Sequence, residues 1–241
     1  MSDLLAIDCG NTRLKWAVFA GETIAASGAL ALAELGTLAN FLPQPMPQRI
    51  VVANVAGQAA AVRIRAAIEG RGRLVRWVRG QREQCGVVSR YADPGQLGAD
   101  RWAALIGARG LHPKACLVVM AGTATTVDVL DGDGVFQGGL ILPGTELMRR
   151  SLTQNTAQLG PEAGEPVDLP RCTADAIAAG VLNAQIGAVE RMFRHVQAQP
   201  GACCILSGGA GEPLHERLAL PKRFEPNLVL LGLARVGREA G

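Results

Sequence analysis

The sequence predicts an α/β protein made of two similar halves, and three observations support this fold class. Short apolar stretches alternate along the 241 residues with segments whose apolar residues recur every three or four positions. These are the patterns of buried strands and of amphipathic helices. The order strand, strand, strand, helix, strand, helix occurs approximately twice. The two halves also begin alike, because residues 7–12 (IDCGNT) and 119–124 (VMAGTA) each end an apolar stretch and turn through small residues.

The first half, which we take as a domain of residues 1–114, begins with consecutive strands. The expected strands are residues 4–8, 13–21, 22–30, 49–57 and 73–78. The expected helices are residues 31–42, 59–70 and 94–113. The proline-rich segment 43–48 ends the first of these helices. The last one has proline and glycine at its entrance and Gly110 and Pro113 at its exit, as helix ends often do.

The second half, residues 115–241, repeats the pattern. The expected strands are residues 115–122, 123–131, 134–144 and 202–211. The expected helices are residues 144–159, 173–199 and 226–237. Residues 160–171 (GPEAGEPVDLPR) form the one segment expected to be irregular. Such a loop either covers a binding cleft or is a plain surface excursion, and the sequence leaves both open.

Composition excludes several classes of protein. An apolar content of 49% and a charged content of 19% are typical of a folded globular chain, and a formal charge of +3 argues against general binding to nucleic acid or membrane. Arginines cluster around Trp77 in residues 71–82, where the solvated face of an edge strand is favoured over a nucleic-acid site. No stretch is long and apolar enough for a spanning helix, and residues 1–10 lack signal-peptide features. The six cysteines lack metal-site spacing, which favours a reducing cytoplasm.

The segment LAIDCGNTRLKW (5–16) raises a question that a β-hairpin does not answer. Gly10 and Asn11 are sufficient for a hairpin turn, but that turn has no need of Asp8, Thr12 and Lys15. A phosphate site would use them all, because exposed backbone N–H groups, a hydroxyl and an ammonium group bind the anion while a carboxylate holds Mg²⁺. Both interpretations stand on this segment alone.

Asp100 is the candidate general base of a phosphoryl transfer. Such a reaction needs an acceptor hydroxyl that is oriented and deprotonated. Asp100 begins an apolar helix, where a first-turn carboxylate is also common as a simple cap. The small residues Gly98 and Ala99 leave room for a substrate, which favours catalysis. Arg101 is either an ion-pair partner or a surface charge.

Two further residues have a structural and a functional interpretation. Tyr91 is the only tyrosine, and it is either a packing aromatic or a hydrogen-bonding contact to substrate. Thr173 begins a long helix, which N-capping alone would explain. Neither the Walker A pattern nor a dinucleotide-binding fingerprint is present.

Taken in order, these motifs resemble type III pantothenate kinases of the acetate-and-sugar-kinase, actin and heat-shock-ATPase superfamily. The similar segments are DCGNTRLKW (8–16), LGADRW (97–102), AGTATTVD (121–128), GGLILPG (138–144), CTADAIAAG (172–180) and ILSGGAG (205–211). The resemblance implies two ribonuclease-H-like (actin-like ATPase) halves with a nucleotide cleft between them. It also implies ATP-dependent phosphorylation of pantothenate, the first step of coenzyme A synthesis.

The resemblance assigns roles to individual residues. Asp100 is the base, and Asp8 holds Mg²⁺ directly or through water. Pantothenate contacts are implied for Tyr91, Gly98, Ala99, Asp100, Arg101 and Thr173. Phosphate contacts are implied for Asp8, Gly10, Asn11, Thr12, Arg13, Leu14, Lys15, Gly122 and Thr123. In the family the threonine equivalent to Thr173 reaches the substrate of the partner subunit, which implies a homodimer with sites at its interface.

One position departs from the family. Met120 stands where the family usually has an aspartate that holds a monovalent cation, K⁺ or NH₄⁺. A thioether is a poor ligand for these ions, which prefer oxygen. The alternatives to a pantothenate kinase are a kinase for another small hydroxylated acceptor and a nucleotide-switched regulatory or binding protein. No nucleic acid or membrane is expected as a partner.

Overall fold

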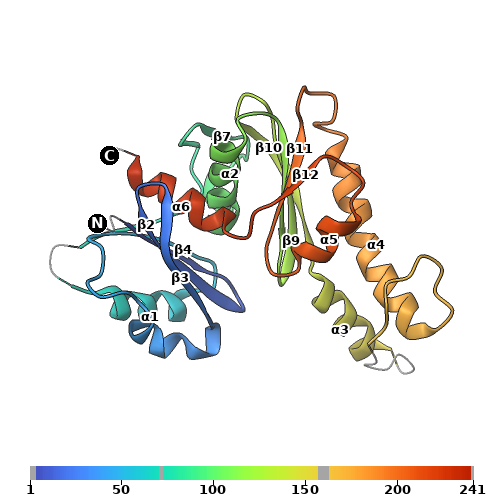
Figure 1. Ribbon diagram of the computed structural model, residues 1–241, viewed down its shortest axis with the longest axis horizontal. Helices are drawn as coiled ribbons and strands as arrows, with labels where there is room; N and C mark the ends of the chain where they lie inside the picture. Colours follow the sequence, from blue (N-terminus) through green and yellow to red (C-terminus); the bar gives the residue numbers. More distant parts are fainter. Residues whose placement is uncertain (1–3, 71–72, 157–162, 240–241) are drawn as a thin grey trace. The chain divides into compact units, whose positions relative to one another are not determined.

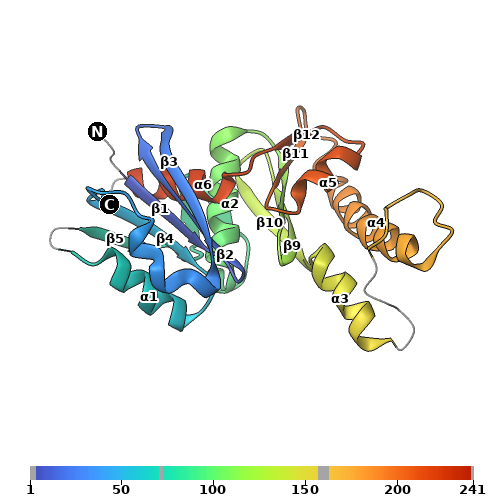
Figure 2. The same cartoon turned by 60° about the horizontal axis from the view of Figure 1, so that its bottom comes forward.

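The computed structural model describes residues 4–70, 73–156 and 163–239 and divides into two compact units (Figures 1 and 2). The first unit comprises residues 1–113, 134–136 and 227–241, and the second comprises residues 114–133 and 137–226. Neither unit is a continuous half of the chain. Each is described separately below.

The first unit is built on a five-stranded sheet with the order β3-β2-β1-β4-β5. Its strands are β1 (Leu4–Cys9), β2 (Arg13–Ala20), β3 (Thr23–Ala31), β4 (Arg49–Asn54) and β5 (Leu74–Trp77). β1 pairs antiparallel with β2 and parallel with β4. Every residue of β1 except Asp8 is buried, as expected of a central strand covered on both faces. β5 is an edge strand, which confirms the expectation for the arginine-rich segment.

One face of this sheet is covered by η1 (Leu32–Asn40) and α1 (Gln58–Ile68), which share a core with β1, β2 and β4. The sequence predicts an ordinary helix over 31–42, but η1 is a 3₁₀-helix. The apolar spacing explains the difference. Leu32, Leu35 and Leu38 recur every third residue and pack on the core together, which suits a helix with three residues per turn.

The other partners of this sheet are α2 (Ala99–Leu111) and α6 (Leu228–Arg238), which pack on each other while α6 also packs on β1 and β4. The two helices touch backbone to backbone. A Cβ added at Gly232 would lie 1.8 Å from the carbonyl oxygen of Ala103, and one added at Gly107 would lie 2.3 Å from that of Leu228. Only glycine permits this approach. Because its apolar face is needed here, α6 joins the first unit, whereas the expected division at residue 114 places residues 226–237 in the second domain.

A short hairpin and a loop lead from β5 to α2. The hairpin joins β6 (Glu83–Gln84) to β7 (Val87–Ser89), and its two turn residues, Cys85 and Gly86, have positive φ angles of 51° and 78°. Positive φ at both turn residues is the requirement of a two-residue hairpin with the usual strand twist. β7 pairs with Val135 and Phe136, and a one-turn 3₁₀ helix, η2 (Pro94–Gln96), precedes α2. The sequence-based prediction missed the hairpin because its strands are too short to show a period.

The second unit contains the strand order β12-β11-β8-β9-β10. The strands are β8 (Cys116–Ala121), β9 (Ala124–Leu130), β10 (Val135–Pro143, of which Gln137 onward lies in this unit), β11 (Cys203–Ser207) and β12 (Lys222–Phe224). The helices are α3 (Thr145–Asn155), α4 (Thr173–Phe193) and α5 (Gly211–Arg217). The inner residues of β8, β9 and β11 form one core with α4 and α5. Both α5 and β12 are absent from the sequence-based prediction, since neither is long enough to show its periodicity.

Two expected segments differ in length or lie partly outside the described residues. The helix predicted over 173–199 ends at Phe193, and turns follow to residue 201. Of the loop expected at 160–171, residues 160–162 lie outside the described residues. The rest is irregular and is attached at two points, by Glu165 N–H to Asp175 Oδ1 (2.9 Å) and by Arg217 Nη1 to the carbonyl oxygen of Pro166 (3.0 Å).

Candidate active site

The turn after β1 combines an acid, small residues and a lysine. Gly10 N–H donates to the carbonyl oxygen of Arg13 (3.0 Å), which closes a tight turn. Asp8 and Lys15 face each other across β1 and β2 in register, so their side chains lie on the same face of the sheet. Asn11, Thr12 and Arg13 are exposed. Leu14 is buried in the core, so only its backbone is available to a ligand.

Asp8 and Asp100 form an acidic centre in the first unit. The pKa of Asp8 is raised from 3.8 to about 7, mainly by burial and in addition by the charge of Asp100, while the charge of Lys15 opposes both. Carboxylates arranged in this way repel each other and bind a divalent cation readily, because the cation removes the repulsion. Asp8 and Asp100 are far apart in the sequence, and the packing of the first unit brings them together.

The N-terminus of α2 accommodates the carboxylate of Asp100 beside Gly98. Gly98 is the N-cap residue, and Asp100 Oδ1 accepts from the N–H of Arg101 (2.8 Å). A Cβ at Gly98 would lie 2.7 Å from Asp100 Oδ1, so the absence of a side chain there creates the space that this carboxylate occupies. Asp100 therefore binds one N–H of the first turn and also lies close enough to Asp8 for its charge to raise the pKa of Asp8. The two roles are compatible.

Arg101 is a buried cation beside two aromatic rings. It is 5% exposed, and its Nη1 donates to Tyr91 Oη at 3.2 Å. Its guanidinium carbon lies 5.8 Å from the centre of the Tyr91 ring and 5.9 Å from that of Phe136. Tyr91 and Phe136 are themselves in contact, with ring centres 5.1 Å apart. This excludes the surface-charge interpretation of Arg101. Sequence reasoning missed Phe136, which no local pattern marks.

Arg82 holds the loop that carries Tyr91. Its Nη1 donates to the carbonyl oxygens of Ser89 (2.8 Å) and Tyr91 (3.1 Å), and its Nη2 to that of Ala92 (3.3 Å). Other arginines of the 71–82 cluster also serve the fold. Arg73 donates to the end of α1, and Arg76 donates to α6. Their use within the fold argues against a nucleic-acid surface here.

The second unit has its own turn of small residues at the end of β8. Gly122 N–H donates to the carbonyl oxygen of Ala124, two residues on, at 3.0 Å, whereas Gly10 N–H donates to a carbonyl oxygen three residues on. Gly122 and Thr123 are exposed. Gly144 supports this turn, because its N–H donates to the carbonyl oxygen of Thr123 (2.9 Å) and a Cβ there would lie 2.1 Å from that of Gly122.

The loop after β11 packs against the same strand end. Gly208 has a φ of 96°, and a Cβ there would lie 2.1 Å from the carbonyl oxygen of Ala121. Ala210 N–H donates to that same oxygen at 3.1 Å. A cavity of about 240 Å³ adjoins this loop. Its lining includes Thr145, Ala178, Val181, Leu182, Ala210 and Pro213.

Met120 lies among hydroxyl-bearing residues. It is in register with Thr126 on β9 and with Ser207 on β11, so the three side chains share a face. Thr126 Oγ1 is buried without a hydrogen-bond partner. The two residues in register with Met120 therefore offer hydroxyl oxygens, and Met120 itself supplies none. The same face also carries the buried carboxylate of Asp128, which is in register with Val118.

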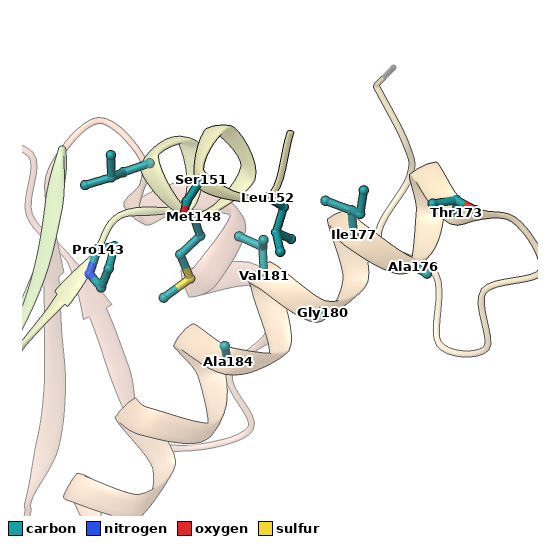
Figure 3. Close-up of a pocket in the computed structure, with 11 residues that line it drawn as sticks. Pro143, Met148, Ser151, Leu152, Thr173, Ala176, Ile177, Gly180, Val181 and Ala184 are labelled. Atoms are coloured by element: carbon teal, nitrogen blue, oxygen red, sulfur yellow. The ribbon is translucent and has the colours of Figure 1, made fainter. Parts of the chain in front are cut away.

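Thr173 opens α4 beside an apolar groove (Figure 3). The N-cap residue is Cys172, which makes no side-chain capping bond, so N-capping does not explain Thr173. The groove has a volume of about 680 Å³ and lies between α3 and α4. Leu147, Leu152 and Ile177 are among its apolar walls, and Thr173 stands at one end.

The structure thus groups the sequence-predicted residues in each unit. In the first unit it brings together Asp8, Lys15 and Asp100, and it separately joins Tyr91 to Arg101. In the second unit Gly122 and Thr123 share one turn, and Thr173 lies on the groove. Among the described residues, no group of three or more histidine, cysteine, aspartate or glutamate side chains forms a metal site, and no helix could span a membrane.

Comparison of the fold with solved structures shows the class of protein. The chain is similar over 98% of its length to 96% of a protein from Sinorhizobium meliloti described as a 2-dehydro-3-deoxygalactonokinase, with a TM-score of 0.61 and 16% identity. It is also similar over 99% of its length to 95% of the activator of 2-hydroxyisocaproyl-CoA dehydratase from Clostridium difficile with bound ADPNP, with a TM-score of 0.56 and 14% identity. The fold is that of the actin-like ATPase and sugar kinase class.

The family follows from the sequence comparisons. The family model of type III pantothenate kinase matches residues 4–195. A type III pantothenate kinase from Aromatoleum aromaticum is 55% identical over 237 residues, which cover 98% of each chain. The chain belongs to the type III pantothenate kinase family.

Proposed function

We propose that this protein transfers the γ-phosphoryl group of ATP to the primary hydroxyl of pantothenate, with Asp100 as general base. The observation that carries the proposal is the acidic centre of Asp8 and Asp100, placed beside Lys15 and a tight glycine turn. Family membership supports the identity of the substrates. Phosphoryl transfer depends on such positioning and charge neutralisation more than on covalent chemistry by the protein.

Asp8 fits the role of a Mg²⁺ ligand. Its pKa of about 7 reflects a carboxylate that is desolvated and repelled by Asp100. Mg²⁺ is usually held by one or two carboxylates together with substrate phosphates and water, so a larger protein cluster is unnecessary. When bound, the ion would neutralise charge that develops on the phosphoryl oxygens. Asp8 would hold it directly or through water.

Two glycine turns are the proposed phosphate contacts. Gly10, Asn11 and Thr12 offer exposed backbone and side-chain donors, and Lys15 adds a positive charge on the same face as Asp8. Gly122 and Thr123 offer a similar turn in the second unit. The apolar cavity beside Ala210 and Pro213 is the proposed position of the adenine base, because it is lined mainly by small and aliphatic side chains.

Acceptor recognition is assigned to the start of α2 and to the Tyr91 loop. Pantothenate carries a carboxylate, and Arg101 is a buried guanidinium whose orientation is set by Tyr91. The missing side chain at Gly98 leaves the space in which the Asp100 carboxylate lies. Asp100 accepts the proton of the acceptor hydroxyl as that oxygen attacks the γ-phosphorus. We include Thr173 as a contact contributed by the second subunit of a homodimer.

The proposal also includes a cytoplasmic location and a reaction with no step that depends on a monovalent cation. All six cysteines are free, which suits the reducing cytoplasm where coenzyme A synthesis would operate. Met120 supplies no oxygen ligand for K⁺ or NH₄⁺, and the two residues in register with it supply only hydroxyls. No step of the reaction is assigned to such an ion.

One assay separates this function from its alternatives. Purified protein is incubated with Mg²⁺ and ATP, and ADP release is followed with and without pantothenate. The kinase gives ADP only with pantothenate, together with one equivalent of phosphorylated product detected by mass spectrometry. A nucleotide-switched regulatory protein would hydrolyse ATP at the same rate without it. A kinase for another acceptor would release ADP only when a different small alcohol is supplied.

A further inference from the structure

Two adjacent residues of α2 are attached to the same short segment of the first unit. Arg101 donates to Tyr91 Oη at 3.2 Å, and Trp102 Nε1 donates to Gln84 Oε1 at 2.9 Å. Gln84 ends β6 and Tyr91 follows β7, so both partners belong to the hairpin segment 83–91. Attachment at two neighbouring side chains resists rotation of the first turn of α2 about the helix axis. That turn carries Asp100.

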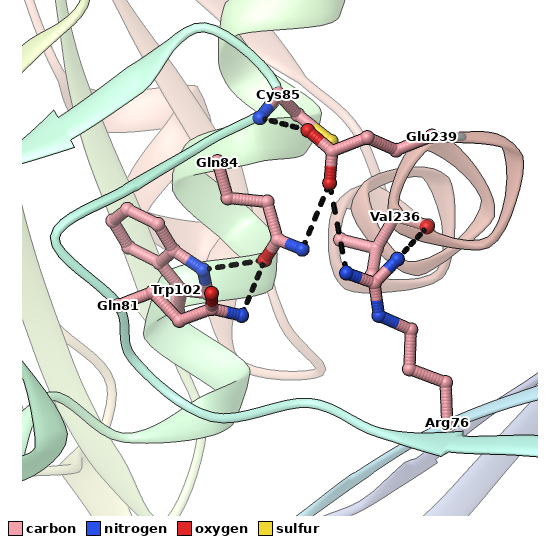
Figure 4. A network of polar contacts seen from close by, with 7 residues as sticks. All are labelled: Arg76, Gln81, Gln84, Cys85, Trp102, Val236 and Glu239. Carbon is pink, nitrogen blue, oxygen red and sulfur yellow. Dashed lines mark hydrogen bonds and ion pairs between the residues drawn. The ribbon is translucent and has the colours of Figure 1, made fainter. Parts of the chain in front are cut away.

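Gln84 is buried, and both the oxygen and the nitrogen of its side-chain amide make hydrogen bonds (Figure 4). Its Oε1 accepts from Trp102 and from Gln81 Nε2 (3.4 Å), and its Nε2 donates to Glu239 Oε2 at 3.0 Å. Trp102 is fully buried and offers only a donor, while the Glu239 carboxylate offers only acceptors. An amide is the group that satisfies both neighbours at once. A carboxylate or an aliphatic side chain at position 84 would fail one of them or both.

Glu239 anchors this amide to the end of α6. Its Oε1 accepts from the N–H of Cys85 at 2.9 Å, and its Oε2 lies 3.7 Å from Arg76 Nη2. Arg76 Nη1 also donates to the carbonyl oxygen of Val236 at 2.9 Å. Partial burial raises the pKa of Glu239, but hydrogen bonds from Cys85 and Gln84 and the charge of Arg76 outweigh it and lower the pKa overall. The carboxylate is therefore ionised at neutral pH.

The glycine contacts between α2 and α6 complete the arrangement. Backbone contact at Gly107 and Gly232 leaves the two helices no room to slide past each other. α6 thus holds the body of α2 through packing, and it holds the first turn through Glu239, Gln84 and Trp102. The kinase residues Asp100 and Arg101 lie directly before Trp102.

We propose that Gln84 is a positioning residue which, through Trp102, sets the orientation of the first turn of α2 and hence the placement of Asp100 and Arg101 toward the acceptor. This inference rests on the proposed function. Gln84 touches neither reactant in it. Because small misplacements of reacting groups cost large factors in rate, loss of this hydrogen bond should slow the reaction with pantothenate while binding of ATP is unchanged.

The test uses two variants, each of which removes one partner of the hydrogen bond between Trp102 and Gln84. Gln84→Met keeps the length of the side chain and removes its hydrogen bonds to Gln81, Trp102 and Glu239, and Trp102→Phe removes only the indole donor. We expect kcat/KM for pantothenate to fall by roughly 10- to 100-fold in each, with the KM for ATP within about threefold of the original. Trp77→Phe is the control, since Trp77 is half-buried on β5. It should leave both constants unchanged.

A rescue experiment addresses the chemistry of the pair. Gln84→Glu alone places a carboxylate against Glu239 and should impair turnover with pantothenate. Adding Glu239→Gln restores the chain of hydrogen bonds. The new amide at position 239 can donate to the carboxylate at position 84 and accept from Cys85 N–H. The carboxylate at position 84 still accepts from Trp102. We expect the double variant to recover most of the lost kcat/KM. The Gln84→Met and Trp102→Phe effects should also be strongly non-additive when combined.

Hydrogen–deuterium exchange of the amides of residues 99–103 provides a readout that does not depend on turnover. Exchange should be faster in Gln84→Met and Trp102→Phe, and near the original rate in the rescued double variant. Lower melting temperatures with unchanged kinetics and unchanged exchange would overturn the proposal and leave Gln84 a purely structural residue. If the original protein does not phosphorylate pantothenate, the proposed function fails, and exchange at residues 99–103 still decides whether Gln84 orients this turn.

Discussion

At the scale of single residues, Asp100 is the group on which the proposed chemistry depends most directly. Replacing it with asparagine preserves size and most hydrogen bonding, including the contact to Arg101 N–H, but removes the base. We expect kcat to fall by ~10²–10⁴-fold, while the dissociation constant of ATP, measured by calorimetry, changes little. Near-normal turnover of Asp100→Asn would leave this residue only its capping role.

Asp8 links the site to the stability of the fold. Its pKa is raised to about 7 in the folded state, so the folded chain binds a proton more tightly than the unfolded chain between pH ~4 and pH ~7. Stability contributed by this group is therefore present at low pH, declines as the pH rises to about 7, and stays low above it. A buried carboxylate that lowers the stability of the fold when it is ionised is expected at a functional site.

Asp8→Asn should consequently stabilise the ligand-free protein while it abolishes turnover. We expect the free energy of unfolding at pH 8 to rise by roughly 1–4 kcal/mol, from the size of the pKa shift, and the gain to disappear below pH ~4. Denaturant unfolding at both pH values measures this. Mg²⁺ with ATP should stabilise the original protein and not the variant. Equal unfolding curves of the original protein and Asp8→Asn at every pH would show that the ionised carboxylate of Asp8 does not destabilise the fold.

Met120 determines the expected response to monovalent cations. It shares a sheet face with the hydroxyls of Thr126 and Ser207, and these neutral groups do not balance the charge of K⁺. We expect less activation by K⁺ or NH₄⁺ than the family norm, tested by exchanging KCl for choline chloride at constant ionic strength. Strong and saturable activation by K⁺ would refute this and would require other oxygen ligands.

At the scale of elements, the turn at Gly122, the second proposed phosphate contact, depends on a glycine that follows two strands later in the chain. A Cβ at Gly144 would lie 2.1 Å and 2.7 Å from the carbonyl oxygens of Gly122 and Thr123, and backbone atoms cannot move aside cheaply. Gly144→Ala should displace that turn and raise the KM for ATP by about tenfold or more, with less effect on pantothenate.

Gly187→Ala is the matched control for that substitution. Gly187 lies in α4 of the same unit, and its added Cβ would meet nothing within 4 Å. Alanine should stabilise the helix by about 0.5–1 kcal/mol without changing either KM. An equal rise of the KM for ATP in both variants, or none in Gly144→Ala, would contradict the supporting role of Gly144.

At the scale of the whole molecule, the apolar groove beside Thr173 favours an assembly of two chains. Leu147 and Leu152 on its wall are 39% and 38% exposed, and exposed apolar clusters commonly mark interfaces. Subunit exchange tests whether sites are shared. Asp100→Asn and Thr173→Val are each expected to be impaired, and about half the subunits of an exchanged mixture are in mixed dimers.

If Asp100 of one chain works with Thr173 of its partner, each mixed dimer has one site with both residues intact. Activity of the mixture should then rise well above the average of the two variants. Light scattering confirms the dimer, and exchange is verified with differently tagged chains. No recovery after proven exchange would mean that each chain builds its own site.

The sequence alone predicts the fold class, the order of the long elements and the two glycine turns that we propose as phosphate contacts. These follow from short-range causes. Buried strands such as β1 and β8 require apolar runs, and the turns at Gly10 and Gly122 require small residues beside them. Asp100 is also identifiable, because its position at the start of an apolar helix depends only on neighbouring residues. The motifs and their order were enough to indicate the family that the comparisons confirm.

Only the tertiary structure decides the environment of these residues. It raises the pKa of Asp8 by burying it and by bringing Asp100 near, buries Arg101 beside Tyr91 and Phe136, and connects Trp102 to Glu239 through Gln84. It also assigns α6 to the first unit. Such contacts join residues that are distant in the chain, and no local pattern encodes them, because they arise from the packing of whole elements whose glycines allow close approach.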